Sequence, residues 1–298
     1  MTNFGTSKLW EHLAETIFKD ALLTENFRST QNFSNRLSMW DPHANSIRYY
    51  KTLLLENILN ASDLFHDIYY NIKNNNLGSP LHVTYNNINY NLEYIISSYE
   101  VEFLSQILGG IHTICEIGAG LGRTCHAILN NSPNINEYTI IDIPVCLKLS
   151  KEYLKSVLDL ELYSKIKFVT NKKANNIKYH DLFINIDSFA EMDPFVIKNY
   201  MNLISKNGKY FYSKNPLGKY NLSSIGKQKP AVNPSYDIMK FGLCKDIIDI
   251  FNYDEITKSI PNYLKQYCPT EFKLISHKVT TPFHYYYQAL YIKNLSQK

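Results

Sequence analysis

Three closely spaced glycines follow an apolar run in "ICEIGAGLGRTCHAIL", at Gly118, Gly120 and Gly122. Glycine tolerates positive φ, and its missing side chain lets a ligand lie against the backbone. The G-x-G-x-G spacing is one residue shorter than the G-x-G-x-x-G fingerprint of dinucleotide-binding turns. Glu116 stands two residues before the first glycine. A carboxylate there would repel a pyrophosphate and attract an ammonium group.

A second acidic residue, Asp142, ends the next apolar run, "YTIID", about 20 residues beyond the turn. A carboxylate at this place accepts hydrogen bonds from a ribose diol. The two acidic residues together favour a nucleoside that carries a cationic amino-acid tail. S-adenosylmethionine fits this description, and NAD fits it less well. The cofactor contacts expected at the turn and beyond it are Glu116, Gly118, Ala119, Gly120, Asp142 and Ile143.

Polar residues also gather at the end of a later apolar run, in "INIDSFAEM". Ligands of parallel α/β sheets bind at the carboxyl ends of the strands. We therefore expect Asp187 or Ser188 to lie near the reacting sulfonium, as cofactor contacts. The alternative is that either residue caps the helix that follows.

Methyl transfer to a hydroxyl needs a base that accepts the proton, and His, Asp and Glu are the usual choices. The carboxylate candidates are Asp187 and Glu191. The imidazole candidates are His277 and His284, in two strands expected at the C-terminus. The sequence leaves open which of the four is the base.

Candidate substrate contacts come from three parts of the chain. Asn215 follows the strand-like segment "GKYFYSKNP", and Arg123 opens the helix after the glycines. Trp40 and His43 lie in an aromatic and cationic N-terminal stretch, which suits a lid over a sugar or nucleotide sugar, an oligomer interface or ordinary packing. No metal ligand set is expected, because the spacing of Asp187 and Asp193 is a weak signal for a Mg²⁺ site.

These residues require elements that bring them to one edge. From residue 111 the chain alternates between buried strand patterns and helix patterns. Such alternation predicts a parallel sheet with right-handed crossovers. The segment 272–294 reads as two strands without room for a helix between them, which predicts an appended antiparallel hairpin. Strands are expected in segments 112–120, 137–144, 165–171, 181–189 and 208–216.

The first hundred residues have a different character. Amphipathic patterns predict helices in segments 7–23, 48–72 and 92–108, and a turn at Gly78 and Pro80 precedes a short strand-like alternation. We therefore expect a mainly helical N-terminal extension over residues 1–100 that serves as a lid or as a homodimer surface. Residues 101–298 are expected to form the cofactor-binding domain.

The motifs "EIGAGLGRT" and "YTIIDIP" resemble motif I and its partner in Rossmann-like S-adenosylmethionine-dependent methyltransferases. Together with "INIDSFAEM" and "YFYSKNP", they resemble the bacterial sugar O-methyltransferases of polysaccharide gene clusters. The resemblance spans roughly residues 78–298. It implies a Rossmann-like α/β fold with a seven-stranded sheet, and methyl transfer to a sugar hydroxyl with S-adenosylhomocysteine as product. It also implies an activated, nucleotide-linked sugar used for a capsular or other surface polysaccharide.

Composition limits the other classes. The chain has 298 residues and a formal net charge of +4, from 31 Lys and Arg against 27 Asp and Glu. This balance is too mild to indicate nucleic-acid binding. The five cysteines form no CxxC pair, which favours free thiols in a reducing compartment. No signal peptide or membrane-spanning run is recognisable, so we expect a cytoplasmic protein.

Two other functions stay open at the level of sequence. One is a non-catalytic Rossmann-like module that binds a nucleoside cofactor. The other is an NAD-dependent enzyme, against which Glu116 and the short glycine spacing both count.

Overall fold

The computed structural model describes residues 6–16, 46–220 and 240–294, which fall into two compact units, 1–59 and 60–298. The first unit contains α1 (Lys8–Thr16) and α2 (Ser46–Leu59). No helix within the described ranges is both long and apolar enough to span a membrane. The predicted division at residue 100 stays a prediction.

The second unit is built on a seven-stranded sheet with the order β10-β11-β7-β6-β3-β4-β5. The strands are β3 (Thr113–Ile117), β4 (Glu137–Asp142), β5 (Ile166–Thr170), β6 (His180–Ile186), β7 (Gly208–Pro216), β10 (Phe272–Val279) and β11 (Tyr286–Lys293). The first five of these run parallel, and β11 is antiparallel to both β7 and β10. This confirms the predicted Rossmann-like α/β sheet of seven strands and its C-terminal hairpin.

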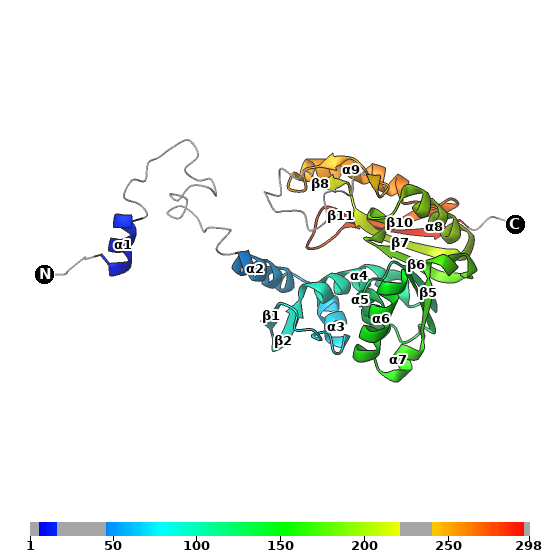
Figure 1. The fold of residues 1–298 in the computed structure, drawn as a ribbon, viewed down its shortest axis with the longest axis horizontal. Helices are drawn as coiled ribbons and strands as arrows, with labels where there is room; N and C mark the ends of the chain where they lie inside the picture. Colours follow the sequence, from blue (N-terminus) through cyan, green and yellow to red (C-terminus); the bar gives the residue numbers. More distant parts are fainter. Residues whose placement is uncertain (1–5, 17–45, 221–239, 295–298) are drawn as a thin grey trace. The chain divides into compact units, whose positions relative to one another are not determined.

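Helices cover both faces of this sheet (Figure 1). One face carries α4 (Leu92–Leu108), α5 (Arg123–Asn131) and α6 (Pro144–Val157), and the other carries α8 (Pro194–Asn207) and α9 (Tyr253–Gln266). Their starts follow local rules. Asn91 caps α4 by accepting the Tyr94 N–H at 3.1 Å, and Asn252 caps α9 in the same way. Proline, whose fixed φ suits a first helical turn, opens both α6 and α8.

The remaining elements are short. They are α3 (Asp63–Asn71), α7 (Leu160–Ser164), two 3₁₀ turns at Asn171–Asn176 and Ser188–Ala190, and two small sheets. The small sheets pair β1 (His82–Tyr85) with β2 (Ile88–Asn91), and β8 (Lys219–Tyr220) with β9 (Ile247–Ile248). The single helix expected over 48–72 is two helices, α2 and α3. The helix is interrupted after Leu59, and Ser62 caps α3 by accepting the Phe65 N–H at 3.0 Å.

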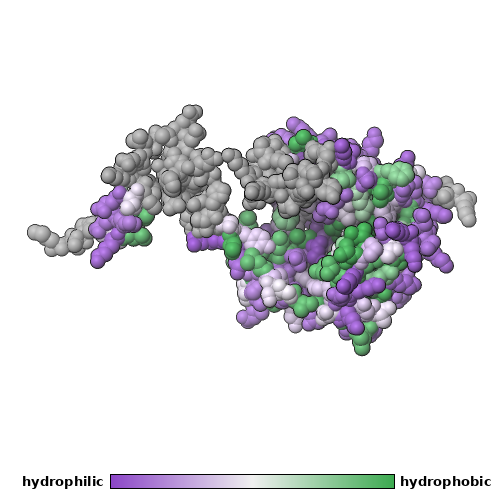
Figure 2. Space-filling model, viewed as in Figure 1, coloured by the Kyte–Doolittle hydropathy of each residue, from purple (hydrophilic) through white to green (hydrophobic). Residues whose placement is uncertain are grey.

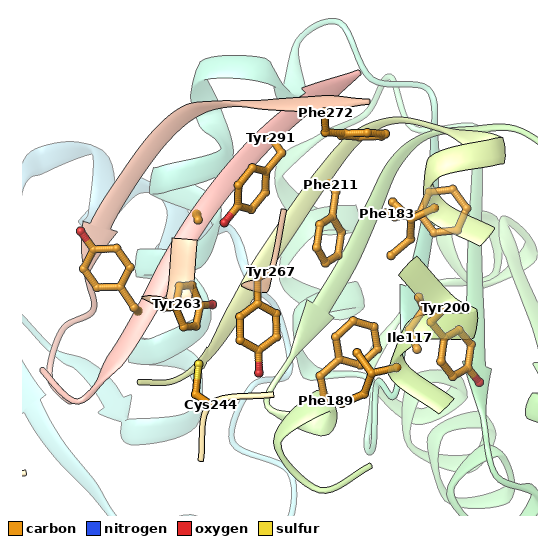
Figure 3. Close-up of a cluster of buried hydrophobic side chains, with 14 of the residues drawn as sticks. Ile117, Phe183, Phe189, Tyr200, Phe211, Cys244, Tyr263, Tyr267, Phe272 and Tyr291 are labelled. Carbon is orange, nitrogen blue, oxygen red and sulfur yellow. The ribbon is translucent and has the colours of Figure 1, made fainter. Parts of the chain in front are cut away.

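The core between the sheet and α8 and α9 is aromatic (Figure 3). Phe211 of β7 lies at its centre and is fully buried, with Phe189 and Tyr291 stacked or tilted within 6.4 Å of its ring. On the surface, Figure 2 shows hydrophobic residues among hydrophilic ones on the visible face. Phe195 of α8 is one of the exposed apolar side chains, at 74% exposure.

Phe211→Ala should lower the free energy of unfolding by about 3–5 kcal/mol, because it removes a buried ring and leaves a cavity. Urea denaturation followed by circular dichroism measures this loss. Phe195→Ala is the matched control and should change stability by less than about 0.5 kcal/mol. Equal losses in the two variants would contradict the placement of Phe211 in the core.

Candidate active site at the carboxyl edge of the sheet

The glycine turn joins β3 to α5 and adopts left-handed backbone at all three glycines, with φ of 74°, 57° and 91°. Two of them also stand where no side chain would fit. A Cβ on Gly118 would overlap the Ser188 hydroxyl, and one on Gly122 would lie 2.7 Å from Leu154 Cδ1. Gly118 therefore admits a close approach from the β6 end, and Gly122 allows α5 to pack close to α6.

Asp142 at the end of β4 ties two strand ends together. Its Oδ2 accepts the Gly120 N–H at 2.9 Å, and its Oδ1 accepts the Ile143 N–H at 2.7 Å. A carboxylate offers about four acceptor positions, so both oxygens retain capacity for hydroxyl donors. The structure thus places Asp142, followed by Ile143, against the turn that contains Gly118 and Gly120.

Glu116 lies beneath this turn, on β3, and only 2% of it is exposed. Its Oε2 accepts the Tyr138 hydroxyl at 2.8 Å. Burial raises the pKa of Glu116 from 4.5 to about 7, while the Tyr138 hydrogen bond opposes that rise. The carboxyl group therefore changes charge near neutral pH, directly below the glycines.

A buried carboxylate that sequence reasoning missed, Glu100 of α4, lies beside α5. It accepts hydrogen bonds from Lys214 Nζ at 2.7 Å, Thr124 Oγ1 at 3.1 Å and Arg123 Nη2 at 3.3 Å. Burial raises the pKa of Glu100, but the Arg123 and Lys214 charges outweigh it and give a net lowering. Glu100 is therefore an ionised link between α4, α5 and β7.

Arg123, a predicted substrate contact, is engaged in this link. Its Nη1 donates to the Glu93 carbonyl at 2.8 Å, in addition to the contact with Glu100. About a fifth of its side chain is exposed, at 22%. The guanidinium thus positions α4 against α5, at the start of the helix that follows the glycine turn.

The end of β6 is held against the glycine turn by Ser188. The Ser188 hydroxyl donates to the Ile117 carbonyl at 3.0 Å and accepts from Asn185 Nδ2 at 2.6 Å. Asp187 has a φ of 64° and donates its N–H to the Lys214 carbonyl at 2.8 Å. The strand expected over 181–189 ends at Ile186, so Asp187 lies beyond β6. The structure brings both predicted cofactor contacts to the ends of β3 and β6.

Two tyrosines that sequence reasoning missed, Tyr220 and Tyr286, lie near Asp187. Tyr286 at the start of β11 donates to Asp187 Oδ1 at 2.9 Å. Burial raises the pKa of both Tyr220 and Tyr286. The contact with Tyr286 leaves Oδ2 of Asp187 as the other acceptor.

The Asp187 end of the site carries a second carboxyl group and an aromatic wall. Burial raises the pKa of Glu191, and the charge of Asp187 raises it further. The ring centroids of Tyr220 and Tyr285 are 5.2 Å apart, and those of Tyr285 and Tyr286 are 5.3 Å apart. The arrangement joins one carboxylate, one carboxyl group of raised pKa and three phenol rings.

Asn215, predicted as a substrate contact, lies buried beside this edge. Its Nδ2 donates to Asn185 Oδ1 at 2.9 Å and to Ser213 Oγ at 3.2 Å. Its backbone N–H donates to the Tyr263 hydroxyl at 3.1 Å. Its Oδ1 is buried without a hydrogen-bond partner in the described part of the chain. Asn215 thus supports Asn185 and, through it, Ser188.

Of the two histidines, His277 lies apart from Asp187. His277 is on β10 and hydrogen-bonds to the Tyr287 hydroxyl at 2.6 Å. β11 and β7 separate β10 from β6, which amounts to about 14 Å across the sheet. His284 is exposed in the connection before β11, with its ring 6.5 Å from that of Tyr253. Trp40 and His43 lie outside the described residues.

Comparison with known proteins adds distant structural likeness. No protein-family model matches the sequence, and no curated protein matches it either. The mitomycin 7-O-methyltransferase MmcR is 13% identical, with a TM-score of 0.43, over 68% of this chain and 56% of that one. A bacterial CtHen1 methyltransferase domain is 10% identical over 67% of this chain and 97% of its own, with a TM-score of 0.47. The glycopeptide N-methyltransferase MtfA, in complex with sinefungin, is 11% identical over 67% of this chain and 87% of its own, with a TM-score of 0.44. Because these similarities are distant, any assignment of chemistry to this chain is argued from its own residues.

Glu116 should make the stability of the protein fall as pH rises. Because its pKa is raised in the folded state, the folded protein binds a proton that the unfolded chain has already released between about pH 4.5 and 7. Stability should decline over that window by up to about 3 kcal/mol and level off above it. Glu116→Gln removes this contribution. Urea denaturation from pH 4.5 to 8 should show a flatter profile for the variant, and parallel profiles would refute the assignment.

Proposed function

We propose that this chain is an S-adenosylmethionine-dependent methyltransferase. The observation that carries the proposal is the juxtaposition of the Gly118–Gly122 turn with Asp142, whose two oxygens lie against the backbone of that turn and the following residue. A ribose diol suits this carboxylate, because it presents two hydroxyl donors. Glu116 beneath the turn favours a cationic amino-acid tail over a pyrophosphate. These features argue for S-adenosylmethionine and against NAD.

The methyl acceptor in this proposal is a hydroxyl group, and Asp187 is its base. S-adenosylmethionine supplies a methyl group already activated by its sulfonium. As the acceptor oxygen forms its bond to the methyl carbon, the carbon–sulfur bond breaks and the hydroxyl proton passes to Asp187 Oδ2. Tyr286 holds the other carboxylate oxygen, which fixes the orientation of the base. Ser188 packs on Gly118 and thereby sets the distance of the neighbouring Asp187 from the cofactor turn.

A sugar is the acceptor that we propose, specifically a nucleotide-activated sugar used for surface polysaccharide. The carboxylate Asp187 and the carboxyl group of Glu191 suit hydroxyl recognition. The rings of Tyr220, Tyr285 and Tyr286 offer flat, amphipathic surfaces for a sugar ring. We further propose that the protein works in the cytoplasm, as a homodimer formed through the N-terminal helices. In this proposal, residues 101–298 form the methyltransferase domain, and residues 1–100 serve as its lid.

Isothermal titration calorimetry tests the cofactor assignment. S-adenosylmethionine and S-adenosylhomocysteine should both bind, and NAD should not. Asp142→Ala should weaken cofactor affinity by at least about tenfold, which corresponds to 1.4 kcal/mol of binding free energy. Glu161→Gln, on an exposed face of α7, is the control and should leave affinity unchanged. Binding of NAD alone would overturn the proposal.

A panel of sugars and nucleotide sugars, with product detection by mass, tests the acceptor. An accepted compound gains the mass of one methylene group. With that compound, Asp187→Asn should lower kcat by about 10²–10⁴-fold, because it removes the base, while cofactor affinity stays within twofold. His277→Ala should retain activity. Full activity of Asp187→Asn together with inactivity of His277→Ala would reassign the base to the histidine.

A further inference from the structure

Beyond the carboxyl edge, the second unit contains a hollow that the proposed chemistry does not use. It lies between α4 and the β10–β11 hairpin and has a volume of about 380 Å³. Sites for small ligands begin at roughly 300 Å³, so the hollow has room for one sugar-sized group. Its lining consists of Tyr99, Glu102, Phe103, Gln106, Lys278, Val279, Thr281 and Gln288.

The chemistry of this lining fits an uncharged, polyhydroxylated ligand. Glu102 and Lys278 are its two charged residues, and their formal charges cancel. A phosphate or a carboxylate would gain no net attraction here, whereas a hydroxyl can donate to Glu102 or accept from Lys278. The amides of Gln106 and Gln288 both donate and accept. Mixed donors and acceptors without net charge favour neutral hydroxyl groups.

Part of this lining is rigidly held. Gln288 is 5% exposed, and its Oε1 accepts the Tyr212 hydroxyl at 2.8 Å. Phe103 packs beside Tyr212, with ring centroids 5.7 Å apart. The hollow therefore combines a fixed amide with an aromatic ring, the pairing of apolar surface and a few placed polar groups that ligand sites use.

β11 supplies a residue to the hollow and another to the site edge. Gln288 pairs across the sheet with Lys214, the residue whose carbonyl accepts the Asp187 N–H. Two residues earlier on the same face of β11 stands Tyr286, which donates to Asp187. Two strand residues span about 7 Å. A ligand that filled the hollow and also reached Asp187 would therefore extend past a single sugar ring.

We propose that this hollow is a second subsite, which takes a neutral sugar unit of a nucleotide-activated acceptor at least two sugar units long, with the nucleotide outside the hollow. The inference rests on the proposed function, because Asp187 acts on the neighbouring unit. The charge balance of the lining sets this subsite apart from one for the diphosphate of a nucleotide sugar.

Saturation-transfer NMR and titration with maltose and lactose test the proposal on the full-length protein. Both neutral disaccharides should bind with dissociation constants in the range of about 1–10 mM. Methyl α-glucoside should bind more weakly, and glucose 1-phosphate should bind at least about tenfold more weakly than the disaccharides, or not at all. Equal or tighter binding of the phosphate would overturn the neutral assignment. Absence of disaccharide binding at about 50 mM would overturn the subsite.

Two neighbouring substitutions on α4 locate the binding. Gln106→Trp fills the hollow and should reduce disaccharide affinity at least tenfold. Ser105→Trp is the matched control, because Ser105 is also exposed, also bonds to a carbonyl three residues earlier, and does not line the hollow. It should leave affinity within twofold. Unchanged affinity in Gln106→Trp would place binding elsewhere.

Cofactor titration of the same variants separates the two proposals. Both tryptophan variants should bind S-adenosylmethionine as the wild type does, which also shows that they are folded. Failure of the wild type to bind the cofactor would count against the proposed function alone, because disaccharide binding in the hollow is measured without cofactor.

Discussion

The buried carboxylate of Glu100 is the interaction on which the other parts of the site depend. It pairs with two cations, Arg123 and Lys214, that come from different elements. Leaving the buried Lys214 ammonium without this partner would cost several kcal/mol. Through Arg123 it fixes the start of α5 and hence the glycine turn. Through Lys214 it fixes the end of β7. The Lys214 carbonyl in turn accepts the Asp187 N–H. One carboxylate thus sets the relative position of the proposed cofactor turn and the proposed base.

Short-range polar contacts then complete the edge. Ser188 joins the ends of β3 and β6, and Asp142 joins the ends of β3 and β4. Each contact links a strand end to the glycine turn, so the turn is constrained from both sides. Tyr286 extends the constraint across the antiparallel hairpin to Asp187. The edge is therefore a network of hydrogen bonds between residues at or beside the ends of β3, β4, β6, β7 and β11.

The sequence was sufficient to predict the sheet and to indicate the glycine turn of the candidate site, because those features have local signals. Strand, turn and helix patterns alternate, and Gly118, Gly120 and Asp142 lie in motifs of fixed spacing. The rest depends on contacts between distant residues. Glu100 and Lys214 are 114 residues apart, and Asp187 and Tyr286 are 99 apart. No local pattern marks one glutamate of an amphipathic helix as the partner of a lysine on a strand. Asp187 was found by its position after an apolar run, but its left-handed backbone was not foreseeable.

The position of β11 has a consequence for how this protein tolerates changes in chain length. β11 pairs on both sides, with β7 and with β10, and its even-numbered residues Tyr286 and Gln288 face the site edge and the hollow. A one-residue slip in a strand moves every side chain to the opposite face. A single-residue insertion within β11 would therefore displace both residues at once. An insertion in the connection that spans residues 280–285 lies outside β11 and does not by itself shift its alternation.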